Sequence, residues 1–148
     1  MDDLEAWVNG LTARDASEGY RCLKRVQAES RRSNAAYPYF ERFAELMESD
    51  RSYLRTRGLV LIAENARWDE DNRVDEILSR YLKHIMDPKP ITARQCVKCL
   101  PEIARAKPGL AGVIRDALLS ANPARYSSAM RPLVEKDIRE ALKALDGE

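Results

Sequence analysis

The chain has 148 residues, of which 45% are hydrophobic and 33% are charged, so it is long enough for one domain with a buried core. Its 25 basic and 24 acidic residues leave a net charge of +1, which argues against a general affinity for nucleic acid or anionic membranes. No apolar run approaches the roughly 18 residues of a membrane span, and acidic residues stand where a secretory signal would carry basic ones. With three cysteines, an odd number, the protein is expected to be cytoplasmic, reduced and not attached to a membrane.

Two sets of residues recur at a nearly constant spacing along the chain. The first set is apolar, is separated by 36, 37 and 37 positions, and consists of Leu4, Phe40, Ile77 and Ile114. Each is followed after 17 residues by an arginine of the second set, namely Arg21, Arg57, Arg94 and Arg131. A period in this range, with helical patterning, is typical of stacked helix pairs that bury their apolar faces against each other. We therefore predict an all-α fold, a right-handed α-solenoid of four helix pairs that forms a single domain over residues 1–148.

The four units cover about residues 1–36, 37–73, 74–110 and 111–148, and each contains two helices. Apolar spacing and helix-ending residues place the helices at about 4–11, 15–31, 38–47, 52–67, 74–85, 91–106, 110–121 and 128–145, where the fourth could also begin at Asp50 and the last at Ser127. Asp15 is expected to cap the second helix, and Pro101 is expected to kink the sixth. The apolar stretch 59–63 would also suit a buried strand, but it aligns with helical segments of the other units, which favours a helix.

Cys96 and Cys99 form a CxxC pair, which in other proteins marks a redox dithiol or half of a metal site. Here both stand in columns that hold Leu, Val or Ile in the first two units, two and five residues after the arginine. A free cysteine in such a place behaves as a small apolar residue. The third cysteine, Cys22, is two units away. We therefore interpret the pair as core packing, with redox or metal chemistry as the alternative, and we expect neither a metal nor another cofactor.

The arginine column could join neighbouring units or face a ligand. Asp50 precedes Arg57 by seven residues, and Asp87 precedes Arg94 by the same number. An acid in the turn and a cation near the start of the second helix suit a ladder of charge-assisted hydrogen bonds. We therefore expect a structural role in preference to ligand binding.

The same pattern changes at both ends of the chain. In the first unit the acid moves to Asp15, six residues before Arg21, and in the last unit Ala124 stands seven residues before Arg131. The predicted ladder is therefore incomplete in these two units.

One surface stripe of the second helices is charged in three units but uncharged in the second unit. Four and eight residues after the arginine, the other units carry opposite charges, the mark of a solvated face, whereas the second unit carries Leu61 and Asn65. Trp68 follows where the flanking units have arginine, and Tyr37 and Tyr39 add aromatic residues nearby. These five residues are a candidate site for a protein partner. The alternative is that the adjoining loop or helix covers Leu61 and Trp68.

The sequence contains no glycine-rich phosphate loop, no nucleophile elbow and no HExxH motif. His84 is the only histidine and shares a column with Leu11, Met47 and Ala121, so we expect it to be packed or half-buried and not a catalytic base. The acidic run 69–71 does not have the spacing of an EF-hand loop and is expected to favour the N-terminus of the next helix. The chain is therefore expected not to be an enzyme.

Part of the sequence resembles known repeat proteins. Asp50, followed by Leu-Arg-Thr-Arg at 54–57 and an apolar helix, resembles the second-helix signature of HEAT and armadillo-like repeats. The segments 37–40, 55–59 and 90–96 also resemble a group of small uncharacterised bacterial proteins labelled SufBD. The first resemblance implies an α-solenoid, and the label of the second implies a role in iron-sulfur cluster assembly. HEAT-like repeats also occur in DNA alkylation-repair glycosylases, which implies a nucleic-acid partner.

Together these features predict a non-catalytic scaffold that binds a protein partner. The second unit, which carries the candidate site, has 6 basic and 8 acidic residues, and this balance favours protein over nucleic acid. One alternative is a nucleic-acid-associated HEAT-like protein, and the other is an accessory factor in iron-sulfur cluster assembly. The sequence indicates no particular oligomeric state.

Overall fold

The computed structural model describes residues 3–147, and these residues form helices and connecting loops without any strand. The α-helices are α1 (Asp3–Asn9), α2 (Ala16–Arg32), α3 (Phe40–Met47), α4 (Ser52–Asn65), α5 (Arg73–Leu82), α6 (Pro90–Ala106), α7 (Ala111–Ser120) and α8 (Arg131–Leu145). Short 3-10 helices are η1 (Gly10–Thr12), η2 (Tyr37–Tyr39), η3 (Ala66–Trp68), η4 (Lys83–Met86), η5 (Pro108–Leu110) and η6 (Pro123–Arg125). The predicted all-α character is confirmed, and the apolar stretch 59–63 lies in α4.

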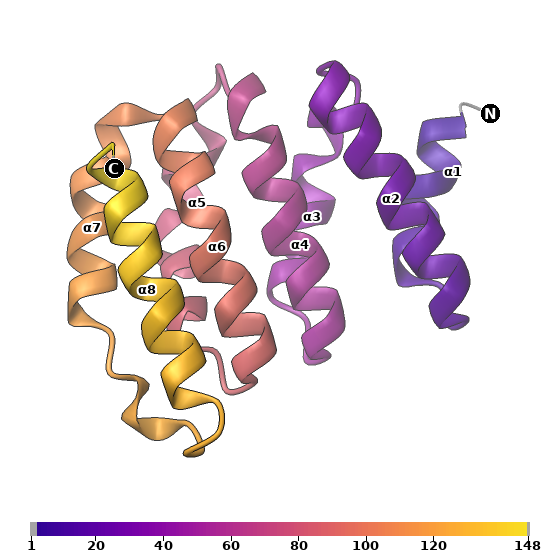
Figure 1. Ribbon diagram of the computed structural model, residues 1–148. Coiled ribbons are helices and arrows are strands. Elements are labelled where there is room, and N and C mark those ends of the chain that lie inside the picture. Colours follow the sequence, from indigo (N-terminus) through magenta and orange to yellow (C-terminus); the bar gives the residue numbers. More distant parts are fainter. Residues whose placement is uncertain (1–2, 148) are drawn as a thin grey trace.

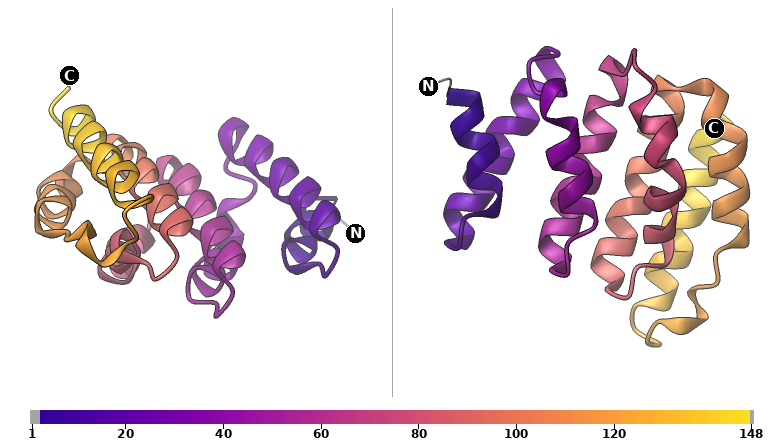
Figure 2. Two further views of the ribbon diagram at one scale, coloured as in Figure 1. Left: turned by 60° about the horizontal axis from the view of Figure 1, so that its bottom comes forward. Right: turned by 180° about the vertical axis from the view of Figure 1, so that it is seen from behind.

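The helices form two rows (Figure 1). α2, α4, α6 and α8 follow one another across the face nearest the viewer, and each contacts the next. α1, α3, α5 and α7 lie behind them, as the view from the opposite side shows (Figure 2). We call the side formed by α2, α4, α6 and α8 the second-helix face. All four of these helices begin at the same edge of the molecule, at the bottom of Figure 1.

The four apolar residues that recur along the chain, Leu4, Phe40, Ile77 and Ile114, are all buried in the core. The column two residues after the arginine, which contains Cys96, is buried at Leu59 and Cys96, half-buried at Leu23 and 38% exposed at Leu133. α8 is the last helix of its row, and it directs Val134 and Ile138 into the core instead. The expected burial of this column is therefore found in the two middle units and is wrong for the last.

Local sequence explains several helix ends. Asp15 caps α2 as predicted, because its side chain accepts hydrogen bonds from the backbone N–H groups of Ser17 and Glu18. α8 begins at Arg131, three residues later than the pattern suggests, after a turn at Ser127. α6 continues through Pro101 to its end, so this proline does not terminate the helix.

None of the helices in residues 3–147 combines the length and the apolar character needed to cross a membrane.

Candidate functional site

The second-helix face contains an apolar groove between the starts of α2, α4, α6 and α8. Its volume is about 480 Å³, and its apolar lining consists of Tyr20, Leu23, Tyr53, Pro90, Ile91 and Met130. Ile91 is 72% exposed, Tyr20 is 54% exposed and Tyr53 is 44% exposed. Single exposed apolar residues are ordinary on protein surfaces, but here large ones from three helices meet at one hollow, which makes the groove a candidate interaction site.

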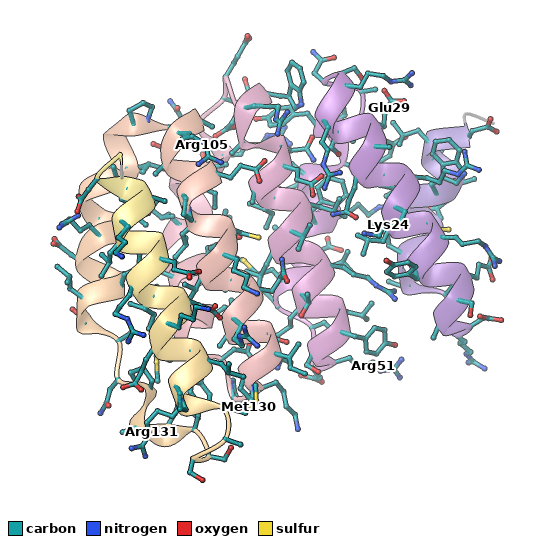
Figure 3. The ribbon with its side chains drawn as sticks, viewed as in Figure 1. Lys24, Glu29, Arg51, Arg105, Met130 and Arg131 are labelled. Carbon is teal, nitrogen blue, oxygen red and sulfur yellow. The ribbon has the colours of Figure 1, made fainter. Side chains whose placement is uncertain are left out.

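Basic side chains accompany the aromatic rings of the groove. Lys24 Nζ lies 5.1 Å from the ring centroid of Tyr20, and Arg57 Cζ lies 5.1 Å from that of Tyr53. The charged residues that line the groove are Arg57 and Lys89, and no carboxylate of the described residues 3–147 lines it. Figure 3 labels Lys24 and two further basic residues near the starts of these helices, Arg51 and Arg131. The groove is therefore apolar at its centre and positively charged around it.

Hydrogen bonds fix the walls of the groove. The hydroxyl groups of Thr56 on α4 and Thr92 on α6 are 2.9 Å apart, and the Thr92 hydroxyl also donates to the Ser52 carbonyl at 3.3 Å. The Arg57 Nη1 group, buried under Tyr53, donates to the Leu11 carbonyl at 2.7 Å and so ties α4 to the segment before α2. These bonds order the walls of the groove without any ligand.

Asp87 positions the start of α6 and with it Ile91. This buried carboxylate accepts two hydrogen bonds from Arg55, at 2.9 and 2.8 Å, and one from the backbone N–H of Lys89 at 2.9 Å. It also lies 2.7 Å from His84 Nδ1. Burial alone would raise the pKa of Asp87, but the bonds with His84, Arg55 and Lys89 outweigh it and hold the pKa well below its usual range. Asp87 is thus ionised at neutral pH and joins α4 to α6.

A polar recess of about 350 Å³ continues from the groove between α2, α4 and α6. The groove and the recess share three residues: Leu23, Thr56 and Arg57. In the recess the buried Gln27 Nε2 donates to Glu64 Oε1 at 2.7 Å, and Arg31 Nη2 donates to the same oxygen at 3.2 Å. Lys24, Lys98 and Glu102 are also part of its lining.

The buried groups of the recess are only partly satisfied. Burial raises the pKa of Glu64, and the hydrogen bonds from Gln27 and Arg31 offset only part of that rise. Gln27 Oε1 and Glu64 Oε2 are both buried and have no hydrogen-bond partner among residues 3–147. Buried acceptors without donors are uncommon in folded proteins and call for an explanation.

The candidate site predicted around α4 is wrong at two of its residues. Leu61 and Asn65 are fully buried, because α4 packs against α2 on one side, α6 on the other and α3 behind. The Asn65 Nδ2 group donates to the Ser30 hydroxyl at 3.0 Å and to the Leu61 carbonyl at 2.9 Å. Trp68 is half-buried, and its Nε1 group donates to the Ser30 carbonyl at 2.7 Å. These residues join α4 to α2, as the alternative interpretation expected.

Tyr37 and Tyr39 are half-buried at the start of α3. The Tyr37 hydroxyl donates to Asp69 Oδ1 at 2.6 Å, so it braces the loop before α5. Burial and the neighbouring Asp69 carboxylate raise the pKa of Tyr37. Tyr39 packs against the core. The predicted aromatic surface around the second unit is therefore used mainly for internal contacts.

The predicted pairs of the arginine ladder are also wrong. Arg57 donates to the Leu11 carbonyl and not to Asp50, and Asp87 is bonded to Arg55, two residues before the repeating arginine. Asp50 is exposed, and it is the backbone carbonyl of Asp50 that accepts a hydrogen bond from Arg55, at 3.1 Å.

The other arginines of the column have individual environments. Arg94 Nε donates to the buried Asp137 of α8 at 2.6 Å, which links the third and fourth units. Arg131 Nη2 donates to the Ala124 carbonyl at 3.1 Å, so a backbone oxygen takes the place of the missing acid. Arg21 is exposed. Cross-unit bonding does occur, but through partners that the repeat does not specify.

Cys96 and Cys99 are buried, which confirms that they pack in the core. Burial raises the pKa of the Cys99 thiol to about 12 and also raises that of Cys96. Cys22 is half-buried on α2. His84 is half-buried beside Asp87, as expected. Within residues 3–147 no group of three or more His, Cys, Asp or Glu side chains is arranged to hold a metal ion.

Sequence reasoning missed most of the groove. Tyr20 and Met130 each stand one residue before the arginine of their unit, but Tyr53 stands four and Ile91 three residues before theirs, so the four residues do not form one column. The available signal was a bulky apolar residue close to the start of each second helix, on the side away from the core. No protein-family model, curated protein or solved structure matches the chain.

Proposed function

We propose that the chain is a HEAT-like α-solenoid of four helix pairs, and that it acts in the cytoplasm as a non-catalytic scaffold whose apolar groove binds a segment of a partner protein. The successive packing of α2, α4, α6 and α8 supports the solenoid, because neighbouring units of such a stack present a common binding surface. One observation carries the proposed binding: Tyr20, Tyr53 and Ile91 are exposed from three helices around one groove.

The lining of the groove supports a particular chemistry for the partner segment. A hollow of about 480 Å³ with an apolar lining is suited to bulky apolar side chains. Arg57 and Lys89 in the lining, with Lys24 beside Tyr20, favour acidic residues next to those apolar side chains. The partner segment is therefore one that combines Leu, Phe or Trp with Asp or Glu.

A single-stranded nucleic acid is the second candidate ligand. Tyr20 and Tyr53 each lie beside a cation, and aromatic rings with neighbouring basic groups can stack bases while the cations contact phosphates. The net charge of +1 favours this candidate less than a protein segment. The iron-sulfur hypothesis has no comparable support, since Cys96 and Cys99 are buried in the core.

Short synthetic peptides test the proposal directly. Each peptide carries Leu and Phe one helical turn apart, flanked by Glu, Ser or Lys, and its binding is measured by isothermal titration calorimetry. We expect the Glu-flanked peptide to bind most tightly and the Lys-flanked peptide least. Ile91→Asp should weaken binding of the Glu-flanked peptide by about tenfold or more, because it places a like charge at the groove and removes a central apolar contact.

Val113→Asp is the matched control, because Val113 is 53% exposed on α7, in the other row of helices. It should leave peptide binding unchanged. Equal effects of the two substitutions, or no preference among the three peptides, would contradict the proposal. A single-stranded oligonucleotide that binds with a steep salt dependence, while the peptides do not bind, would establish the second candidate instead.

A further inference from the structure

The polar recess beside the groove contains two hydrogen-bond acceptors that the protein itself does not use. Gln27 Oε1 and Glu64 Oε2 belong to two side chains that are bonded to each other through their other polar atoms, at 2.7 Å. Glu64 is 4% exposed and Gln27 is 6% exposed, so neither side chain is solvated in the ordinary way. A ligand that satisfies the recess must bring hydrogen-bond donors.

The groups around the two acceptors restrict the ligand further. Lys24, Arg57 and Lys98 line the recess and Arg31 contacts Glu64, so a cationic ligand group would meet four positive charges. A carboxylate brings no donor and would face Glu64. The ammonium groups of the two lysines can donate to a neutral oxygen, because each carries three N–H donors. The recess is thus suited to a neutral group that offers two N–H donors and one carbonyl acceptor.

We propose that the recess binds the primary carboxamide of an Asn or Gln side chain on the same partner segment that occupies the groove. The amide nitrogen donates to Gln27 Oε1 and Glu64 Oε2, and the amide oxygen accepts from Lys24 or Lys98. This inference rests on the proposed function, because the groove and the recess are continuous through Leu23, Thr56 and Arg57. The ligand reaches Glu64 when the Arg31 side chain, which is 61% exposed, moves aside.

The test uses the full chain and two Glu-flanked peptides that differ at one position, which is either Gln or the similarly shaped Met. The unmodified protein should bind the Gln peptide about tenfold more tightly than the Met peptide, which corresponds to roughly one net hydrogen bond. The double variant Gln27→Met, Glu64→Met removes both acceptors while keeping similar side-chain shapes. It should lose the preference for Gln and bind the Met peptide as the unmodified protein does.

Glu102→Gln serves as the control, because Glu102 lines the recess but is bonded to Arg67 at its rim. This variant should keep the preference for the Gln peptide. If the double variant does not fold, Gln27→Met alone should lose part of the preference, since it removes one of the two acceptors and leaves Glu64 Oε2 in place.

The outcomes separate this inference from the proposed function. Equal binding of both peptides by the unmodified protein would overturn the carboxamide inference and leave the groove as a binding site. A preference that survives the loss of both acceptors would also overturn it. If neither peptide binds, the proposed function fails and this inference fails with it. Binding of a cytosine-containing oligonucleotide that depends on Gln27 and Glu64, in place of peptide binding, would assign the recess to a nucleobase and overturn the proposal.

Discussion

The groups that surround Asp87 stabilise the ionised form of its side chain. Its side chain has no exposed surface, and that of Arg55 is only 12% exposed, so the two charges interact with little screening by water. His84 and the backbone N–H of Lys89 occupy further positions around the carboxylate. Removal of one partner from such a buried pair leaves a charge without compensation, which costs far more than the loss of a surface ion pair.

Arg55→Met should therefore lower the free energy of unfolding by about 3 kcal/mol, since Met keeps much of the aliphatic packing but leaves Asp87 without its bidentate partner. Urea denaturation at pH 7 measures this change. The matched control is Arg105→Met on α6, where the exposed side chain lies on the surface (Figure 3) and the change should stay within about 0.5 kcal/mol. Similar losses in the two variants would show that Arg55 contributes packing alone.

The arginine column shows what a sequence repeat leaves open at the level of single residues. The period fixes where the Cα atom of each arginine lies, but the long side chain can reach acceptors in several directions. Arg57 bonds to the backbone carbonyl of Leu11, an acceptor that every residue has and that no pattern reveals. Arg94 bonds to Asp137, which lies 43 residues later and in no column with Asp50. The sequence therefore predicts that these arginines join neighbouring units, but it does not reveal which atoms accept their hydrogen bonds.

α3 and α4 approach each other closely at Gly58. A Cβ atom at this position would lie 2.5 Å from the backbone nitrogen of Met47 and 2.6 Å from the carbonyl oxygen of Phe43. Both are backbone atoms of α3 and cannot move aside as a flexible side chain would. The glycine is therefore required by the helix contact, even though glycine weakens a helix interior.

Gly58→Ala should destabilise the protein by about 1–3 kcal/mol or more, because the added methyl group forces α3 and α4 apart. Gly112→Ala on α7 is the same substitution at a position where a Cβ atom meets nothing within 4 Å. It should stabilise the protein by about 0.5–1 kcal/mol through the higher helix propensity of alanine. Thermal unfolding followed by circular dichroism compares the two, and a change of the same sign in both would refute the role given to Gly58.

The sequence allowed the helices to be placed better than the surface. The apolar period predicted the buried positions Leu4, Phe40, Ile77 and Ile114, because a core residue must recur wherever the same helix contact recurs. The comparison of equivalent positions wrongly placed Leu61 and Asn65 on the surface, because it treats every unit alike. The stretch 59–63 is apolar on all sides, and a helix of that kind is usually buried all round. Nine of the 14 residues of α4 are buried, so the local composition was the better guide there.

At the scale of the whole molecule, two buried carboxylates hold opposite edges of the helix rows. Asp69 lies in the loop before α5 and Asp87 in the loop before α6, and these loops are at the top and the bottom of Figure 1. Asp69 accepts hydrogen bonds from Tyr37 and from Lys107 Nζ, at 2.6 and 3.2 Å, which connects segments about 70 residues apart in the sequence. At the other edge, the Tyr126 hydroxyl donates to the backbone carbonyl of Asp87 at 2.6 Å.

Both carboxylates make the whole stack sensitive to acid. Burial alone would raise the pKa of Asp69, but hydrogen bonds from Tyr37, from the Val74 and Arg73 backbone and from Lys107 outweigh it, so the pKa is lowered, as it is at Asp87. In the unfolded chain an Asp titrates near pH 3.9. The stability that these groups contribute is therefore present above about pH 4 and is lost as the pH falls through the lower folded-state pKa values.

Glu64 affects the pH dependence of stability in the opposite direction to Asp69 and Asp87. Its pKa is raised in the folded protein by burial, so the folded state binds this proton more tightly than the unfolded chain, in which a Glu titrates near pH 4.3. Stability should therefore increase as the pH falls from neutral through the folded-state pKa of Glu64, and decrease again below about pH 4. The free energy of unfolding is therefore expected to be highest at a mildly acidic pH.

Urea denaturation between pH 7 and pH 3 tests this profile, because urea is uncharged and does not screen the ion pairs. Asp69→Asn and Asp87→Asn should each be less stable than the unmodified protein at pH 7. The difference should narrow toward pH 3, because the aspartates of the unfolded chain become protonated there while folding still requires their charged form. Glu64→Met should remove the gain between neutral and mildly acidic pH and leave the acid loss in place. If the differences for both Asn variants stayed constant with pH, the acid loss would have to arise from groups other than these two edges.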